Sequence, residues 1–65
     1  MSIAKVIEVI AEGESVEAAI ENAVQQATDT LRNVRTVYVK NIQALVRDGK
    51  ITTYRLNAKV TFVVD

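Results

Sequence analysis

Residues Ile51 to Val64 alternate without interruption between two kinds of side chain. This two-residue period is typical of a β-strand with one buried face and one hydrated face, and few strands reach such a length. The mainly apolar set is Thr52, Tyr54, Leu56, Ala58, Val60, Phe62 and Val64, and the polar set is Thr53, Arg55, Asn57, Lys59 and Thr61. The polar face of this strand must therefore meet either bulk water or a compartment built by several copies of the chain.

The length of the chain favours an oligomer. Its 65 residues form one domain, residues 1–65, and a domain of this size buries only about 60% of the surface that its unfolded chain exposes. Such domains usually need disulfides, a structural metal or oligomerisation. The sequence has no Cys and no His, which excludes disulfides and most transition-metal sites. Apolar residues make up 49% of the chain. A single helix packed on one face of a sheet cannot cover that much apolar surface, so we expect a homo-oligomer.

The charge balance argues against a nucleic-acid partner. Eight basic and eight acidic side chains cancel, whereas nucleic-acid-binding proteins carry a basic surplus. The charges are divided along the chain: the segment through Leu31 carries a net charge of five negative, and the rest carries five positive. No apolar run approaches the ~18 residues of a membrane span, and the first residues do not resemble a secretory signal. We expect a cytoplasmic protein without a membrane partner.

The other segments predict two strands and one helix. A β-branched run over Ile3–Ala11 predicts a strand at a sheet edge, followed by a loop at Glu12-Gly13-Glu14. Ser15 is a natural N-cap for a helix that extends to about Asn33, with small alanines that let it approach a sheet closely. The apolar stripe of this helix is Val16, Ile20, Ala23, Val24, Ala27, Leu31 and Val34.

The dipeptide Asp48-Gly49 predicts a type I′ hairpin between a strand over Val34–Arg47 and the closing strand. A two-residue loop gives the cross-strand pairs Arg47–Lys50, Leu45–Thr52, Val39–Ala58 and Val37–Val60. This register places Asn41 and Gln43 on the covered face and Ile42 on the hydrated face, which suggests a β-bulge nearby. The order β-α-β-β with the closing strand in the centre makes every strand pair antiparallel and gives an α+β fold.

The chain resembles the dodecin family from about Lys5 to Val64. The resemblance is carried by the helix end Thr30-Leu31-Arg32-Asn33-Val34, the hairpin Asp48-Gly49-Lys50, and the closing pattern Thr53-Tyr54-Arg55 to Val60-Thr61-Phe62. It implies a β-α-β-β subunit in which a three-stranded antiparallel sheet partly wraps one helix, and twelve copies that close into a hollow homododecamer. The implied function is non-enzymatic binding and storage of small ligands, most often flavins stacked in pairs.

The sequence departs from the flavin-binding dodecins at two positions. Those proteins resemble one another in a Trp after the helix, which sandwiches the flavin ring, and in a Gln of the last strand, which hydrogen-bonds that ring. Here Thr36 stands at the position of the Trp and Arg55 at the position of the Gln. Threonine has no π surface, so the ~1 kcal/mol or more that an aromatic stack adds is missing. We therefore expect a flavin-poor dodecin, more similar to the branch of the family that is associated with calcium.

Four residues on the polar sheet face are the candidate ligand-binding residues: Thr36, Tyr38, Arg55 and Lys59. Arg55 could hold a phosphate or carboxylate as a bidentate fork, and Lys59 could attract it as a point charge. The alternative is that Arg55 pairs with a carboxylate of a neighbouring subunit and that Tyr38 packs at an interface.

Two further interpretations concern the acidic helix. Glu14, Glu17 and Glu21 lie on one surface near its start, so copies that meet at a symmetry axis could form an oxygen-rich site for a hard cation; the alternative is a solvated acidic face. A structural or interaction shell without a bound organic ligand is the second functional hypothesis. An enzyme is not expected, because the chain has no His and its acids cluster on a polar helix face.

Overall fold

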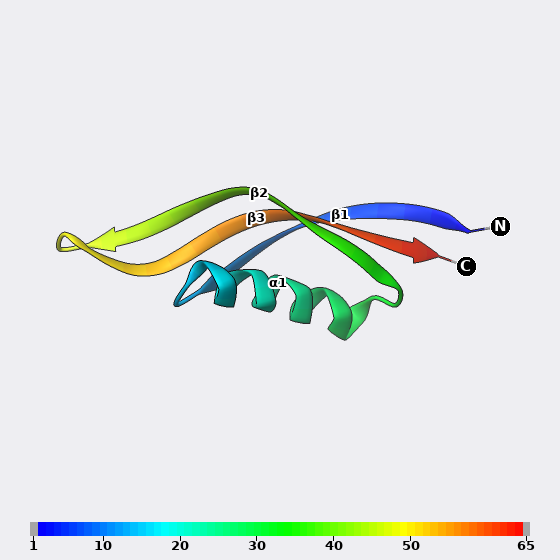
Figure 1. Cartoon of the computed structure of the whole chain (residues 1–65), viewed down its shortest axis with the longest axis horizontal. Helices are drawn as coiled ribbons and strands as arrows, with labels where there is room; N and C mark the ends of the chain where they lie inside the picture. Colours follow the sequence, from blue (N-terminus) through cyan, green and yellow to red (C-terminus); the bar gives the residue numbers. More distant parts are fainter. Residues whose placement is uncertain (1, 65) are drawn as a thin grey trace.

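The computed structural model describes residues 2–64 and has four elements: β1 (Ile3–Gly13), α1 (Val16–Thr30), β2 (Val34–Arg47) and β3 (Lys50–Val64). The strands form one antiparallel sheet in the order β1-β3-β2 (Figure 1). The predicted β-α-β-β order, the central place of β3 and the edge position of β1 are confirmed. Within residues 2–64 no helix has the length and apolarity needed to cross a membrane.

The helix lies against one face of the sheet and leaves the other without cover (Figure 1). We call this second side the open face. Its central residues, from the strand register, are Val6, Glu8, Ile10 and Glu12 in β1, Arg55, Asn57, Lys59 and Thr61 in β3, and Thr36, Tyr38, Asn41 and Gln43 in β2. The predicted division of β3 into two faces is confirmed, since Leu56, Ala58 and Val60 are buried on the helix side.

The helix begins where the sequence predicts and ends earlier. The Ser15 hydroxyl accepts a hydrogen bond from the backbone N–H of Ala18 at 3.0 Å, as an N-cap does. The predicted end at about Asn33 is wrong: the last helical residue is Thr30, and Leu31 is already extended. Asn33 then adopts a positive φ of 60°, a conformation that asparagine tolerates better than most residues and that turns the chain into β2.

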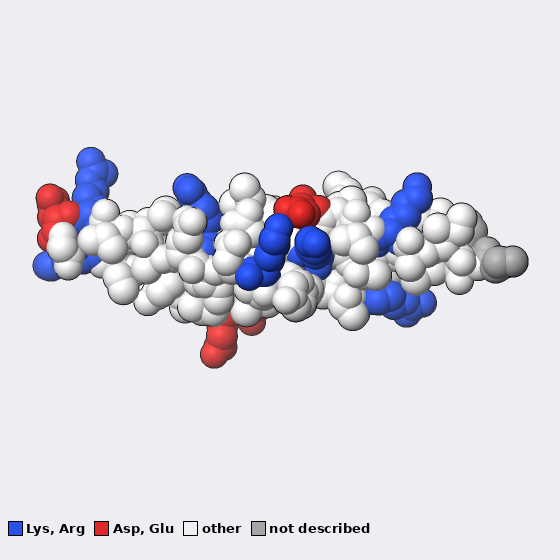
Figure 2. Space-filling model, turned by 90° about the horizontal axis from the view of Figure 1, so that it is seen from above, with Lys and Arg blue, Asp and Glu red and all other residues white. Residues whose placement is uncertain are grey.

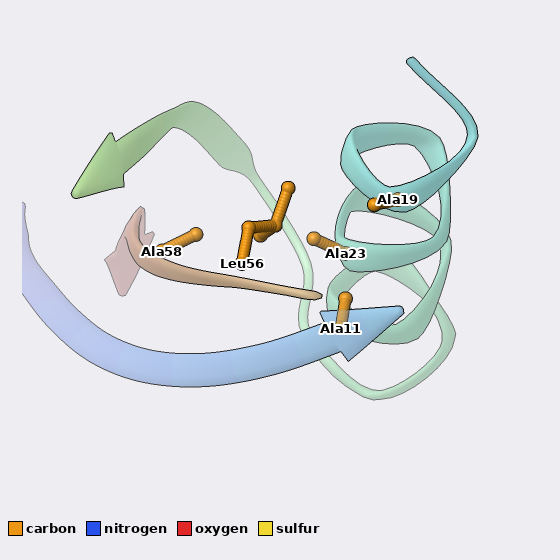
Figure 3. Close-up of a cluster of buried hydrophobic side chains, with 5 residues drawn as sticks. All are labelled: Ala11, Ala19, Ala23, Leu56 and Ala58. Atoms are coloured by element: carbon orange, nitrogen blue, oxygen red, sulfur yellow. The ribbon is translucent and has the colours of Figure 1, made fainter. Parts of the chain in front are cut away.

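The packed face of α1 is made of alanines. Ala19, Ala23 and Ala27 are buried at four-residue steps, so the predicted close approach of helix and sheet is confirmed. Figure 3 shows two of them beside the side chains from the sheet: the cluster is Ala11, Ala19, Ala23, Leu56 and Ala58. Val24, which the sequence places in the buried stripe, is 37% exposed. The core is therefore small, with Leu56 and Val60 as its largest fully buried side chains.

The predicted loop at Glu12-Gly13-Glu14 is wrong in its first two residues. The first strand continues through Gly13, which pairs with Tyr54, and Glu12 pairs with Arg55. A Cβ on Gly13 would lie 2.4 Å from the backbone nitrogen of Ala19. Gly13 is therefore needed for the close approach of β1 to the first turns of α1.

The hairpin has the predicted turn. Asp48 and Gly49 have φ values of 54° and 74°, and positive φ at both positions is what a type I′ turn requires. The pair Arg47–Lys50 is confirmed, but Leu45 faces Thr53, so the predicted pair Leu45–Thr52 is wrong. The register shifts there because Thr52 has no cross-strand Cα partner; its hydroxyl instead donates a hydrogen bond to the carbonyl of Leu45 at 3.2 Å.

A second register shift corrects the first. Lys40 has no partner in β3, so the pairs Val39–Ala58 and Val37–Val60 form as predicted, and the expected bulge near Asn41 is confirmed. Between the two shifts the faces are exchanged relative to the prediction. Asn41 and Gln43 lie on the open face, and Ile42, predicted there, instead faces Leu56.

The subunit is long and thin. Its extents are 52 × 18 × 13 Å and its radius of gyration is 13.5 Å, whereas a compact chain of this length has about 11 Å. Its accessible area of 4826 Å² exceeds the roughly 4,100 Å² expected for a folded monomer of 7.2 kDa. The 15-residue helix is about 22 Å long and the longest strand about 50 Å, so the hairpin extends past α1 (Figure 1). Much of the sheet consequently lacks cover within one subunit.

Candidate functional site

The open face is organised in four cross-strand rows, each centred on a polar residue of β3. From the hairpin side toward the chain termini, and in the order β1, β3, β2, the rows are Glu12–Arg55–Gln43, Ile10–Asn57–Asn41, Glu8–Lys59–Tyr38 and Val6–Thr61–Thr36. Each row therefore combines a charged, amide or hydroxyl centre with an acid or an apolar side chain from β1.

The four predicted ligand-binding residues share the open face but do not form one group. Tyr38 and Lys59 are cross-strand partners, and Thr36 lies in the next row. Arg55 is six residues along β3 from Thr61, the partner of Thr36, which corresponds to about 20 Å. Within one subunit, Arg55 and Thr36 cannot contact the same small ligand.

Arg55 is paired with a carboxylate of its own chain. Its Nε and Nη2 atoms lie 2.8 and 2.7 Å from the same oxygen, Oε2 of Glu12. The two side chains are 41% and 46% exposed, so water screens the pair and its contribution to stability is small. Glu12 thus supplies a carboxylate within the subunit, and the alternative that Arg55 pairs with a carboxylate of a neighbouring subunit stays a prediction.

A second group of charges surrounds Tyr38. Lys40 Nζ lies 3.8 Å from Oε1 of Glu8, and the register places Lys59 between Glu8 and Tyr38. The two lysines and one acid carry a net charge of one positive, next to a tyrosine that is 65% exposed. Figure 2, seen from above the sheet, shows basic and acidic side chains close together near the middle of this face.

Sequence analysis missed Glu8 and Glu12 as members of this face. The signal was present: the two acids are four residues apart in the first strand, and Lys59 and Arg55 are four apart in the last. Antiparallel pairing brings Glu8 opposite Lys59 and Glu12 opposite Arg55. Opposite charges across neighbouring strands stabilise that register.

No single-subunit metal site accompanies the open face. In the part of the chain that the structure describes, no group of three or more His, Cys, Asp or Glu is close enough to hold a metal ion. The hard-cation site suggested by Glu14, Glu17 and Glu21 thus needs carboxylates from several copies and stays a prediction. Two surface hollows lie beside α1, and neither is lined by any of the four predicted residues.

The model of the dodecin family matches residues 3–65. This chain belongs to the dodecin family. An arginine-to-alanine mutant of the Thermus thermophilus dodecin has 27% identity and a TM-score of 0.92, over 100% of this chain and 98% of that one. The Streptomyces davaonensis dodecin has 26% identity and a TM-score of 0.92, over 98% and 96%. A comparison with curated proteins found no match.

These matches confirm the predicted family and subunit fold. Dodecins are small flavin-binding proteins that form dodecamers. A third similar structure is a tryptophan-to-phenylalanine mutant of the T. thermophilus dodecin, with 27% identity and a TM-score of 0.91 over 100% of this chain and 98% of that one. That dodecin therefore carries a Trp, whereas this sequence has none.

Proposed function

We propose that this dodecin is a non-enzymatic binding and storage protein, whose copies close into a homododecamer and hold small ligands between their open faces. The observation that carries the proposal is the apolar surface around the polar centre of the open face. Val6, Ile10 and Tyr38 are 56%, 61% and 65% exposed in one subunit. A second copy facing this surface would cover it and enclose the polar rows.

The ligand that fits best is a small aromatic molecule with an anionic group. The ring of Tyr38 offers a π surface for stacking. Lys59, its cross-strand partner, and Lys40 supply positive charge beside it, only partly balanced by Glu8. Thr36 and Thr61 in the adjacent row add hydroxyl groups that donate or accept hydrogen bonds.

A structural shell without an organic ligand is the second candidate. It is favoured by the Glu12–Arg55 contact. Arg55 stands where the family's flavin-binding members have the glutamine that binds the ring, and its guanidinium already has a partner in its own subunit. Native mass spectrometry distinguishes the candidates: additional organic mass on the purified assembly supports storage, and a clean assembly supports the shell.

Assembly itself is the first prediction to test. Sedimentation at micromolar concentration should give a species of about 86 kDa, which is twelve copies of 7.2 kDa. An Ile10→Lys variant should give much smaller species, because a charge then lies in the covered open face. Thr28→Lys adds the same charge on the exposed side of α1, outside the surface hollow that Ile10 lines, and should keep the wild-type mass. A well-folded wild-type monomer would refute the proposal.

Restoring the family's tryptophan should strengthen flavin binding. We expect Thr36→Trp to raise the affinity for riboflavin about fivefold or more, which corresponds to ~1 kcal/mol per aromatic stack. Riboflavin fluorescence quenching measures the affinity. Thr36→Val keeps the size of threonine without a ring and should bind as the wild type does. Equal affinities of all three proteins would show that position 36 does not face the flavin ring.

A further inference from the structure

The two ends of the open face differ in charge. At one end, Glu12 and Arg55 form a pair with no net charge, next to the amide of Gln43. At the other end, Glu8 contacts Lys40 and is the cross-strand partner of Lys59, so one acid beside two lysines leaves one positive charge. Arg55 and Lys59 are four residues apart on β3, or about 13 Å. Only the lysine end thus has positive charge left for an anionic ligand group.

We propose that Glu12 is a built-in competitor that keeps anionic groups away from Arg55 and thereby determines which ligands, and which orientation, the open face accepts. This inference rests on the proposed function of that face. A guanidinium without a partner binds phosphate or carboxylate through two parallel N–H groups. Here Nε and Nη2, which form one such edge, both point at Oε2 of Glu12.

An incoming anion at this position meets two obstacles. It must displace Glu12 from the Nε and Nη2 edge of Arg55, or approach the guanidinium on its other side with a carboxylate close by. Like charges at such distances repel, and the half-exposed position weakens this repulsion without removing it. A neutral donor or acceptor has no such repulsion. The Arg55 end therefore selects neutral hydrogen-bonding groups, and an anionic tail is directed toward Lys59 and Lys40.

The test compares two ligands with the same ring. Flavin mononucleotide carries a phosphate and riboflavin does not, so the ratio of their affinities isolates the response to the anion. We expect Glu12→Gln to raise this ratio about tenfold over the wild type, because the amide neither repels the phosphate nor neutralises Arg55. Asp29→Asn removes the same charge from α1, away from the open face, and should leave the ratio unchanged. An unchanged ratio in Glu12→Gln, with both flavins bound, overturns the inference.

A second measurement does not depend on flavin. Thermal unfolding with increasing inorganic phosphate, at constant ionic strength, should raise the midpoint of Glu12→Gln more than that of the wild type or of Asp29→Asn. If no flavin binds to any variant but phosphate stabilises Glu12→Gln selectively, the ligand class of the proposed function fails and the role of Glu12 stands. If phosphate affects all three proteins equally, the role of Glu12 is refuted. Sedimentation confirms that each variant keeps the wild-type assembly.

Discussion

A Leu56→Ala variant should unfold at a much lower urea concentration than the wild type. We expect a loss of about 3 kcal/mol in the free energy of unfolding, within the range of 2–5 found for buried leucines. Leu56 is fully buried, and its neighbours in the cluster are Ala11, Ala19, Ala23 and Ala58 (Figure 3). The alanines have no rotamers with which to fill the cavity, and the half-buried side chains that pack against the cluster are stiff β-branched ones, so the site does not collapse easily. These half-buried side chains are Val9, Ile20, Val37 and Val39.

The control for this variant is Leu31→Ala, measured by circular dichroism at the same protein concentration. Leu31 is only half-buried at the end of α1, so the same deletion removes less covered apolar surface. We expect it to cost less than half as much as Leu56→Ala. Equal losses, or a loss below 1 kcal/mol for Leu56→Ala, would mean that the alanine cluster does not behave as a rigid core.

Gly13→Ala should be nearly as destabilising, although it adds only a methyl group. The new Cβ would lie 2.4 Å from the nitrogen of Ala19 and 2.8 Å from the carbonyl carbon of Ala18. Both are backbone atoms, so no flexible side chain can move aside, and β1 and α1 must separate. We expect a loss of about 3 kcal/mol, at the upper end of the usual range for overpacking. Urea unfolding measures it.

Gly49→Ala is the matched control for Gly13→Ala. Nothing lies within 4 Å of a Cβ at Gly49, but its φ of +74° disfavours alanine. The substitution should cost about 1 kcal/mol through backbone conformation alone. If Gly13→Ala is no more destabilising than Gly49→Ala, then the contact between β1 and α1 is looser than the structure shows, and Gly13 is not required for it.

The secondary structure could be predicted where a local signal was strong. The alternation in β3 has only one interpretation, and a helix-connected strand followed by a hairpin leaves few ways to arrange three strands. Ser15 and Asp48-Gly49 marked the helix start and the turn correctly, because caps and tight turns depend on a few adjacent residues.

The errors arose where tertiary contacts decide. Gly13 suggested a loop after Ala11, since glycine usually marks a turn, but here it permits a close approach between two elements. Between the turn and Val39, the register of the hairpin depends on two residues without cross-strand Cα partners, Thr52 and Lys40. Neither residue type signals a bulge, so counting from the turn exchanged the faces of the residues between them.

The site was predicted in part for the same reasons. Thr36, Tyr38, Arg55 and Lys59 lie on the open face as expected, because alternation fixes the face. Their separation into two groups follows from distances along β3, and the partner of Arg55 could not be found while Glu12 was assigned to a loop. The amides of Asn41 and Gln43 reach the open face only through the two bulges.

The alanine-lined packing of α1 has a thermodynamic consequence. A subunit that buries so little by itself depends on its neighbours for the rest, so folding and association become one equilibrium governed by mass action. The unfolding midpoint of such an assembly rises with the protein concentration. A destabilised variant that stays folded in concentrated solution can therefore dissociate and unfold at nanomolar concentration.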